Sequence, residues 1–394
     1  MKRWKFFVVI IGLGTAVNCL PANAKTLTPL TIAVNVGIPL PSIANDAVLY
    51  FKKGIVLYRQ GDKRGAIASY NQALKLNPEL AAAYYNRGIV RTDLGDPAGA
   101  LADYSQALKL DPNYSDAYNN RGNARREIGD VKGAMEDYNQ ALRLNPQDAE
   151  AYNNRGITRY HMGDTQGAVA DYNQALQIDP KLVDAYLNRG SVRADLGNVK
   201  DAIADFNQAL QINPKDSQAY YNRGLTKRET GDMRGAIQDY TQALRINPNF
   251  VDAYNNRGST HLRMGDTSKA IADFNQAIQR NPKLAEAYYN RGTAQSNLGN
   301  QQGAIQDFSK ALQIDPNLPQ AYGNRGVARF NLGDNKSAIA DLQKAAQMFQ
   351  ELGLTDEAKH AGEIIKRFEK RGGTGKGERV KEYEEKKRSQ YYKG

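Results

Sequence analysis

One phrase of five residues returns along this chain with a period of 34 residues. It reads Tyr-Tyr-Asn-Arg-Gly at Tyr84–Gly88, and its equivalents begin at Tyr118, Tyr152, Tyr186, Tyr220, Tyr254, Tyr288 and Tyr322. A fixed period of this length is typical of stacked helical hairpins, each of which buries its apolar face against its neighbours. The period therefore predicts one elongated array instead of several globular domains.

Each repeat carries the signals of two helices joined by a short turn. The first helix is expected to contain Tyr84 and Gly88 and to end at Gly95, because glycine adopts the left-handed backbone that closes a helix. Asp96 follows, and its side chain is suited to cap the amides that open the second helix. A glycine followed by Asp or Asn recurs at this place in later repeats.

The second helix has a stripe of small and aromatic residues. Ala100, Tyr104 and Ala107 stand at spacings of four and three, which places them on one helical face. Pro112 then prevents the helix from continuing. Because Gly88 and Ala100 both lack bulk, we expect the two helices of a repeat to approach closely.

These residues resemble the tetratricopeptide repeat, whose signature places are occupied by Gly88, Ala100, Tyr104, Ala107 and Pro112. The resemblance implies an all-α fold, a right-handed α-solenoid (superhelix) of nine helix-turn-helix repeats whose first helices line an inner groove. We expect the repeats at 47–80, 81–114, 115–148, 149–182, 183–216, 217–250, 251–284, 285–318 and 319–352. An amphipathic segment at 353–371 is predicted to be a capping helix, because the last hairpin would otherwise leave its apolar side in water.

The ends of the chain differ from the array. Residues 1–24 are interpreted as a signal peptide with cleavage after Ala24, which predicts export to a bacterial periplasm or a comparable lumen. The alternative is an uncleaved segment that holds the protein to a membrane. Residues 372–394 are rich in glycine and then densely charged, and we expect a flexible charged tail.

Residues 25–46 form an apolar linker in which Leu30, Ile32, Val34, Val36, Ile38 and Leu40 alternate with other residues. Alternation of this kind predicts an extended segment that needs a surface to lie on. The first repeat offers an apolar stripe of Val48, Phe51, Ile55 and Tyr58. We hypothesise that residues 30–40 cover it, either as a permanent cap or as a displaceable occupant of the groove.

The net charge of +11 does not indicate a nucleic-acid partner, because much of it lies at the two ends. The first five residues contribute +3 and residues 353–394 contribute +4, which leaves +4 for the array. The basic tail allows contact with a membrane surface.

The sequence predicts a protein that is not an enzyme and that needs no cofactor or metal. Its single cysteine, Cys19, lies in the predicted signal, and His161, His261 and His360 stand in separate repeats without metal-ligand spacing. The glycine-rich stretch at 372–377 does not join a strand to a helix, as a phosphate-binding loop does.

In eight repeats, arginine stands immediately before the glycine equivalent to Gly88, where the family usually has an apolar residue. An aspartate recurs on the second helix of the same repeats. The first repeat lacks both residues, with Lys53 at the arginine position and Ser69 at the aspartate position. This covariation predicts structural ion pairs, among them Arg87 with Asp103, Arg121 with Asp137 and Arg155 with Asp171. The alternative is a basic stripe that binds an anionic polymer. A second basic row, from Arg91 onward, has no assigned role.

Asparagine recurs one residue before each of these arginines, at Asn86, Asn120, Asn154, Asn188, Asn222, Asn256, Asn290 and Asn324. An Asn side chain offers a donor and an acceptor, so such a row can pair with the backbone of an extended peptide. In this respect the array resembles the repeat groove of O-GlcNAc transferases, whose catalytic region is absent. The alternative is that these side chains bridge neighbouring repeats or cap local backbone.

Specificity is expected from aromatic and apolar side chains beside this row: Phe51, Ile55, Tyr58, Tyr85, Tyr160, Tyr221 and Tyr289. Acids such as Asp93 and Glu127 interleave with them. We therefore predict a protein-binding scaffold or assembly factor whose groove holds an extended peptide or partner segment, neutral or basic with apolar anchors. The alternative function is an array that uses the arginine rows and the basic tail to bind a polyanion or an acidic membrane surface.

Overall fold

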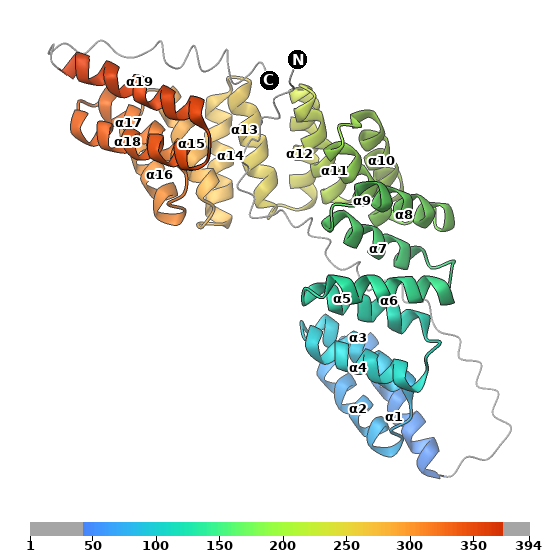
Figure 1. Cartoon of the computed structure of the whole chain (residues 1–394). Helices are drawn as coiled ribbons and strands as arrows, with labels where there is room; N and C mark the ends of the chain where they lie inside the picture. Colours follow the sequence, from blue (N-terminus) through green and yellow to red (C-terminus); the bar gives the residue numbers. More distant parts are fainter. Residues whose placement is uncertain (1–41, 373–394) are drawn as a thin grey trace. The chain divides into compact units, whose positions relative to one another are not determined.

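The computed structural model describes residues 42–372, where the chain forms nineteen α-helices and no strand (Figure 1). The helices follow one another in helix-turn-helix pairs, which confirms the predicted all-α array of nine hairpins followed by one more helix. The predicted signal peptide at 1–24, the linker as far as residue 41 and the tail from residue 373 lie outside the described residues.

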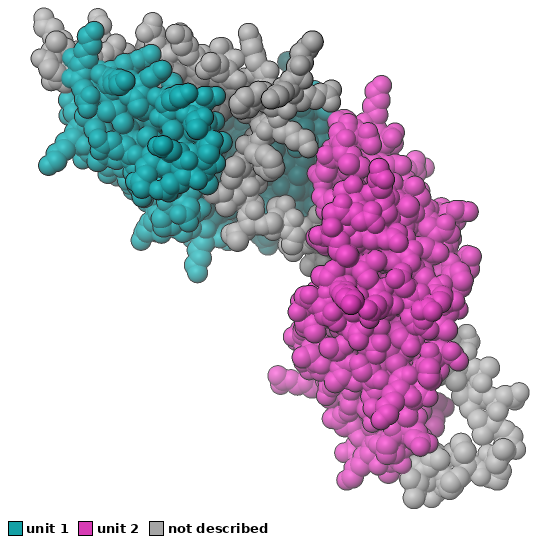
Figure 2. All heavy atoms as spheres, in the orientation of Figure 1, with its two compact units in different colours: residues 1–15, 215–394 teal, residues 16–214 magenta. Residues whose placement is uncertain are grey.

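The helices divide into two compact units, which meet in the sequence between Pro214 and Lys215 (Figure 2). Unit 2 holds α1 (Ser42–Arg59), α2 (Lys63–Leu76), α3 (Ala81–Asp93), α4 (Pro97–Leu110), α5 (Ser115–Glu127), α6 (Val131–Leu144), α7 (Ala149–His161), α8 (Thr165–Ile178), α9 (Val183–Asp195) and α10 (Val199–Ile212). Unit 1 holds α11 (Ser217–Glu229), α12 (Met233–Ile246), α13 (Val251–Arg263), α14 (Thr267–Arg280), α15 (Ala285–Asn297), α16 (Gln301–Ile314), α17 (Pro319–Asn331), α18 (Asn335–Glu351) and α19 (Thr355–Gly372).

The expected array of consecutive hairpins thus divides into two compact units. Within each unit a hairpin packs mainly on the hairpins before and after it, so each core is built from local contacts between neighbours. A stack of this kind can separate into compact units without interrupting its sequence period.

The turn inside a hairpin is built as its residues predict. Gly95 has a φ of +74°, a backbone conformation that residues with a side chain rarely adopt. Asp96 then caps α4, because its Oδ1 accepts a hydrogen bond from the amide of Gly99 at 2.9 Å.

The two helices of a hairpin meet where a glycine faces an aromatic ring. A Cβ placed on Gly88 would lie 2.6 Å from Cε1 of Tyr104, and the Tyr104 side chain is almost fully buried. Ala100 and Ala107 on the same face are completely buried. Glycine is therefore required at this position for the helices to pack at their observed separation.

Neighbouring repeats pack through the second helix of one and the first helix of the next. Ala83 and Val90 on α3 join Tyr70, Ala73 and Leu74 on α2 in one apolar cluster. Within each unit the first helices of neighbouring repeats also contact one another, as α3, α5, α7 and α9 do, whereas no comparable contact joins described second helices. The first helices therefore lie on the inner side of each unit.

The start of the array differs from the prediction, whereas its last helix is placed as expected. Helix α1 begins at Ser42 and not at residue 47, because Pro41 immediately precedes it and proline is tolerated at a helix start but not farther along. At the other end α19 packs against α18, with Ile364 and Phe368 buried. The rings of Phe330 and Phe368 stack with centroids 3.5 Å apart.

Candidate protein-binding surface

The arginine before each glycine is held by the aspartate of the second helix. Arg87 donates from Nε to Oδ2 of Asp103 at 2.9 Å and from Nη2 to Oδ1 at 2.6 Å, which is a two-pronged ion pair. The Asp103 side chain is only 3% exposed and that of Arg87 15%. Equivalent pairs join Arg121 to Asp137, Arg155 to Asp171, Arg189 to Asp205, Arg223 to Asp239, Arg257 to Asp273, Arg291 to Asp307 and Arg325 to Asp341.

The second basic row, which had no assigned role, supplies a further cation to the same aspartates. Nη1 of Arg91 lies 2.9 Å from Oδ2 of Asp103 and donates to the carbonyl of Gly99 at 3.0 Å. The corresponding cations are Arg125, Arg159, Arg193, Lys227 and Arg329. In two repeats His261 and Gln295 occupy this place, and Asp273 and Asp307 there pair with one arginine each.

Several of these arginines also connect their repeat to the one before it. Nη1 of Arg87 donates to Oδ1 of Asn71 on the preceding second helix, and its guanidinium lies 5.4 Å from the ring centroid of Tyr84. Comparable bonds run from Arg155 to Asn139, from Arg189 to Asn173 and from Arg291 to Asn275. Because their donors face partners within the array, these guanidiniums do not form a free basic stripe.

The asparagine row lies between neighbouring first helices. In unit 2 the Nδ2 of Asn120 donates to the hydroxyl of Tyr85 at 2.9 Å, and that of Asn154 donates to Oδ1 of Asn119 at 3.1 Å. The remaining bridges run from Asn188 to Asn153, from Asn256 to Tyr221, from Asn290 to Asn255 and from Asn324 to Tyr289.

Some members of the row also bond within their own helix. Asn86 donates to the carbonyl of Ala82 at 2.8 Å, and Asn222 accepts from Nε2 of Gln218 at 2.8 Å. The asparagine side chains are thus held both by bridges between repeats and by hydrogen bonds within their own helix.

Three of the residues predicted to line the groove are buried instead. Phe51, Tyr85 and Tyr221 are 5–7% exposed, because each ring packs against the aromatic residue of its own second helix. The other four, Ile55, Tyr58, Tyr160 and Tyr289, are partly exposed. A large side chain at this helical position thus serves packing first, and in Tyr85 and Tyr221 only the hydroxyl is engaged by the asparagine row.

Two of the partly exposed tyrosines bond to acids of the next repeat. The hydroxyl of Tyr58 donates to Oδ2 of Asp93 at 2.7 Å, and that of Tyr160 donates to Oδ2 of Asp195. Desolvation, together with the neighbouring carboxylate, raises the pKa of Tyr160 to about 12. These pairs hold the carboxylates on the inner face.

A set of acids that the sequence reasoning missed lies at the start of the first helices in unit 2. Asp116 on α5, Glu150 on α7 and Asp184 on α9, here called the acidic row, occupy the second position of three successive first helices. These acids recur with the period of 34 residues, and this recurrence could have identified them from the sequence.

The acidic row is electrostatically crowded. Desolvation raises the pKa of Asp116. For Glu150, desolvation and then the charges of Asp148, Asp184 and Asp116 raise the pKa. Since the neighbouring carboxylates disfavour ionisation of Glu150, a cation placed beside them would be stabilised.

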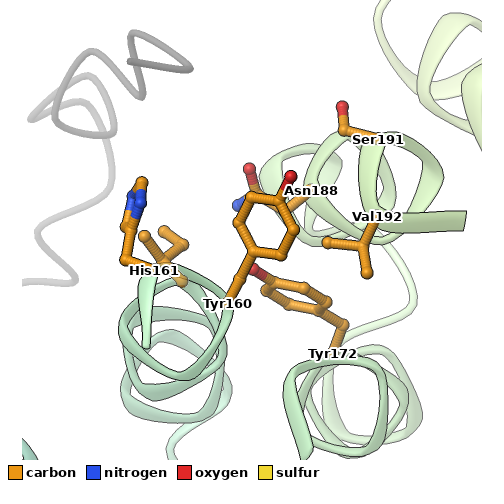
Figure 3. A pocket seen from close by; sticks show the side chains of 7 residues that line it. Tyr160, His161, Tyr172, Asn188, Ser191 and Val192 are labelled. Atoms are coloured by element: carbon orange, nitrogen blue, oxygen red, sulfur yellow. The ribbon is translucent and has the colours of Figure 1, made fainter. Parts of the chain in front are cut away.

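A small hollow opens between α7, α8 and α9. Figure 3 shows Tyr160 beside Tyr172, with Asn188 and Val192 on the neighbouring helix and His161 turned away from them. Its free volume is about 10 Å³, which is room for about one water molecule. The hollow is therefore too small to receive an apolar anchor of a ligand.

Neither metal sites nor membrane spans were found in the part of the chain that the structure describes. Across residues 42–372, no three His, Cys, Asp or Glu side chains are arranged to hold a metal ion. In the same range, no helix combines the length and the apolar character that crossing a bilayer requires.

Comparison with known families agrees with the geometry of the hairpins. Profiles described as "TPR repeat" match residues 122–163, 158–197, 190–231 and 225–265, and profiles described as "Tetratricopeptide repeat" match residues 51–115, 104–136, 251–284, 285–318 and 319–352. The chain belongs to the tetratricopeptide repeat family. Arrays of this family are in general non-catalytic scaffolds that bind proteins or peptides.

Individual relatives match this tetratricopeptide array only in part. A TPR repeat-containing protein of Methanocaldococcus jannaschii is 53% identical over 38 residues, which are 10% of this chain and 7% of that protein. The crystal structure of MamA is 28% identical and covers 41% of this chain and 94% of its own, with a TM-score of 0.39. The Cut9–Hcn1 hetero-tetramer is 16% identical and covers 80% of this chain and 76% of its own, with a TM-score of 0.52, a likeness of fold alone.

Proposed function

We propose that this tetratricopeptide array is a non-catalytic scaffold that holds an extended, basic segment of a partner protein along the first helices of unit 2. The observation that carries the proposal is the acidic row. The charges of Asp116 and Asp184 add to desolvation in raising the pKa of Glu150 between them, and partial burial raises the pKa of Asp116. Lysine or arginine side chains of a partner would relieve this repulsion.

The asparagine row gives the same face a capacity for backbone recognition. An Asn side chain has two amide hydrogens and a carbonyl acceptor, so the single bridge from Asn154 to Asn119 leaves further capacity. A segment running across α5 and α7 would meet one acid and one partly exposed asparagine on each helix, whereas on α9 it would meet Asp184 beside the buried Asn188. The partner is therefore expected to be extended, with basic residues facing the acidic row.

A binding experiment with matched peptides tests the proposal. A labelled peptide that alternates lysine with leucine is compared with one in which glutamine replaces every lysine, and fluorescence anisotropy reports binding to the full chain. The double variant Asp116→Asn, Glu150→Gln should weaken binding of the lysine peptide by about tenfold. The control double variant Glu79→Gln, Glu136→Gln removes the same charge from exposed positions outside the first helices and should leave the affinity unchanged.

Two outcomes would count against the proposal. In the first, both double variants weaken the lysine peptide equally, which would indicate a general charge effect. In the second, neither peptide binds while an anionic polymer such as polyphosphate does, with an affinity that falls steeply with salt. The second outcome would favour the polyanion-binding alternative, although the arginine row is engaged by aspartates within the array.

We further propose that the protein is exported and acts in a periplasm or a comparable lumen. The support is the basic start, the apolar run and the small residues that end at Ala24. N-terminal sequencing of the protein from its native compartment should give Lys25 as the first residue. A chain that retains residues 1–24 and sediments with membranes would indicate the uncleaved anchor instead.

A further inference from the structure

The side of α1 that faces away from the second repeat, here called its outer side, exposes apolar residues at two positions. The equivalent positions are buried in every later repeat. The third residue of the later first helices is a fully buried alanine, and the tenth is at most 3% exposed. The third residues are Ala83, Ala117, Ala151, Ala185, Ala219, Ala253, Ala287 and Ala321, and the tenth residues are Val90, Ala124, Thr158, Val192, Thr226, Thr260, Ala294 and Ala328.

Within a unit, the second helix of the preceding repeat covers these positions. Ala83 and Val90, for example, lie in one apolar cluster with Tyr70, Ala73 and Leu74 of α2. Helix α1 is the first of unit 2 and has no preceding hairpin among the described residues (Figure 1). Its equivalent residues, one period of 34 earlier, are Leu49 and Val56.

Leu49 is 64% exposed and Val56 50%, and both are larger than most of their counterparts in later repeats. Tyr50 beside them is 37% exposed. An end face of a repeat stack normally carries polar residues, since terminal repeats must remain soluble. Large apolar residues at this place indicate that the face is covered.

The chain itself supplies a suitable cover immediately before α1. Residues 26–45 contain no charged residue, and Leu30, Ile32, Val34, Val36, Ile38 and Leu40 share one parity. If extended, the eleven residues 30–40 span about 36 Å, and α1 with its 18 residues is about 27 Å long. A segment that turns back at Pro41 is therefore long enough to run along the whole helix.

We propose that residues 30–40 fold back on the outer side of α1 and bury Leu49 and Val56. The segment takes the place that a preceding second helix occupies in later repeats, and it completes the stack at this end. This surface is not the stripe of Val48, Phe51, Ile55 and Tyr58 that the sequence suggested, because Phe51 already lies in the core of the first repeat. The inner face of the array stays open to a partner.

Photo-crosslinking tests the contact directly. In the full chain, p-benzoylphenylalanine replaces Leu49, the protein is irradiated, and the crosslinked peptides are identified by mass spectrometry. The expected product joins position 49 to residues 30–40 of the same chain. The control position is Leu94, which is 48% exposed at a hairpin turn and should give no such product.

A double-mutant cycle supplies the energetic test. The segment variant Ile32→Ser, Val34→Ser, Val36→Ser should lower the midpoint of thermal unfolding by about 2–4 °C and increase binding of an apolar dye. In the background Leu49→Ser, Val56→Ser the same segment variant should have no further effect, because the contact is already lost. The control Thr31→Ser, Asn35→Ser changes the opposite parity and should leave the midpoint unchanged.

Two results would overturn the proposal. One is full additivity of the two sets of substitutions, with no crosslink to residues 30–40. The other is a crosslink that joins two chains and depends on protein concentration, which would assign the face to a second copy. Helical circular dichroism of each variant verifies that the array has remained folded.

Discussion

Arg87 and Asp103 join the two helices of one repeat through two parallel hydrogen bonds, of 2.9 Å from Nε to Oδ2 and 2.6 Å from Nη2 to Oδ1. The same guanidinium reaches Oδ1 of Asn71 on the preceding second helix. Since the Asp103 carboxylate is almost completely buried, it needs the Arg87 guanidinium to compensate for its lost hydration. The pair therefore links three helices and repeats with the period of the array.

Removing the charge of such an aspartate is expected to destabilise the array. Asp171→Asn leaves Arg155 without its anion and removes the nearer of the two anions beside Arg159, and breaking a buried pair costs about 3–5 kcal/mol. Asp273→Asn is the matched control and should cost less, because among the described residues Arg257 is the only arginine or lysine that pairs with Asp273. Urea unfolding followed by circular dichroism measures both. Equal losses would show that the second cation adds nothing.

The glycine that faces each aromatic ring should tolerate no side chain. Gly88→Ala brings a Cβ to 2.6 Å from Tyr104 and should cost about 1–3 kcal/mol through overpacking. Gly362→Ala is the control in α19, where a Cβ would meet nothing within 4 Å. That change should stabilise the protein by about 0.5–1 kcal/mol, because alanine favours the helix. The midpoints of thermal unfolding of the two variants should therefore shift in opposite directions, down for Gly88→Ala and up for Gly362→Ala.

The bridge between first helices should show a measurable coupling. Tyr85→Phe and Asn120→Ala each remove one partner of the 2.9 Å bond, and each should cost about 0.5–1.5 kcal/mol. In the double variant the losses should not add, since both remove the same interaction. Tyr114→Phe serves as the control, because the Tyr114 ring packs on Tyr85 without this bond. Additive losses would mean that the bridge contributes no stability.

The acidic row should make stability depend on pH in a defined direction. The folded-state pKa of Glu150 is raised, so the folded protein binds a proton there more tightly than the unfolded chain. Stability is consequently gained as the pH falls through the raised pKa and is reduced above it. Glu150→Gln should thus raise the unfolding midpoint at pH 7 and have little effect below about pH 4.

The exposed Glu136 on α6 provides the matched control for this pH dependence. Its substitution, Glu136→Gln, should leave the difference between pH 7 and pH 4 unchanged. A stabilisation by Glu150→Gln that is as large at pH 4 as at pH 7 would contradict the electrostatic explanation.

Much of the fold could be predicted from the sequence because its determinants are local and repeated. Gly95 and Asp96 specify a turn wherever they occur, and Gly88 with Tyr104 marks the close approach of two helices inside one repeat. The pairing of Arg87 with Asp103 could be inferred because both residues are absent together from the first repeat. Each of these contacts lies within a single period, so a pattern seen in several copies is sufficient to infer it.

The candidate site could be predicted less well. Asn120 was noticed as a member of a row, but its hydrogen bond to Tyr85 crosses between repeats and depends on how they stack. Tyr85 and Tyr221 were expected in the groove, yet their rings are buried against their own second helices. Asp116 and Glu150 were overlooked because the crowding of their carboxylates follows from the spacing of neighbouring first helices.

The sequence by itself determined the helix pairs, their turns and their period, because these follow from backbone conformation and side-chain volume within each repeat. Only the tertiary structure decided which polar rows hold repeats together and which face a partner. The physical reason is that a hydrogen-bonding side chain can serve either purpose, and the distance to the next helix selects between them. The exposure of Leu49 and Val56 is decided in the same way, by the presence or absence of a neighbouring helix.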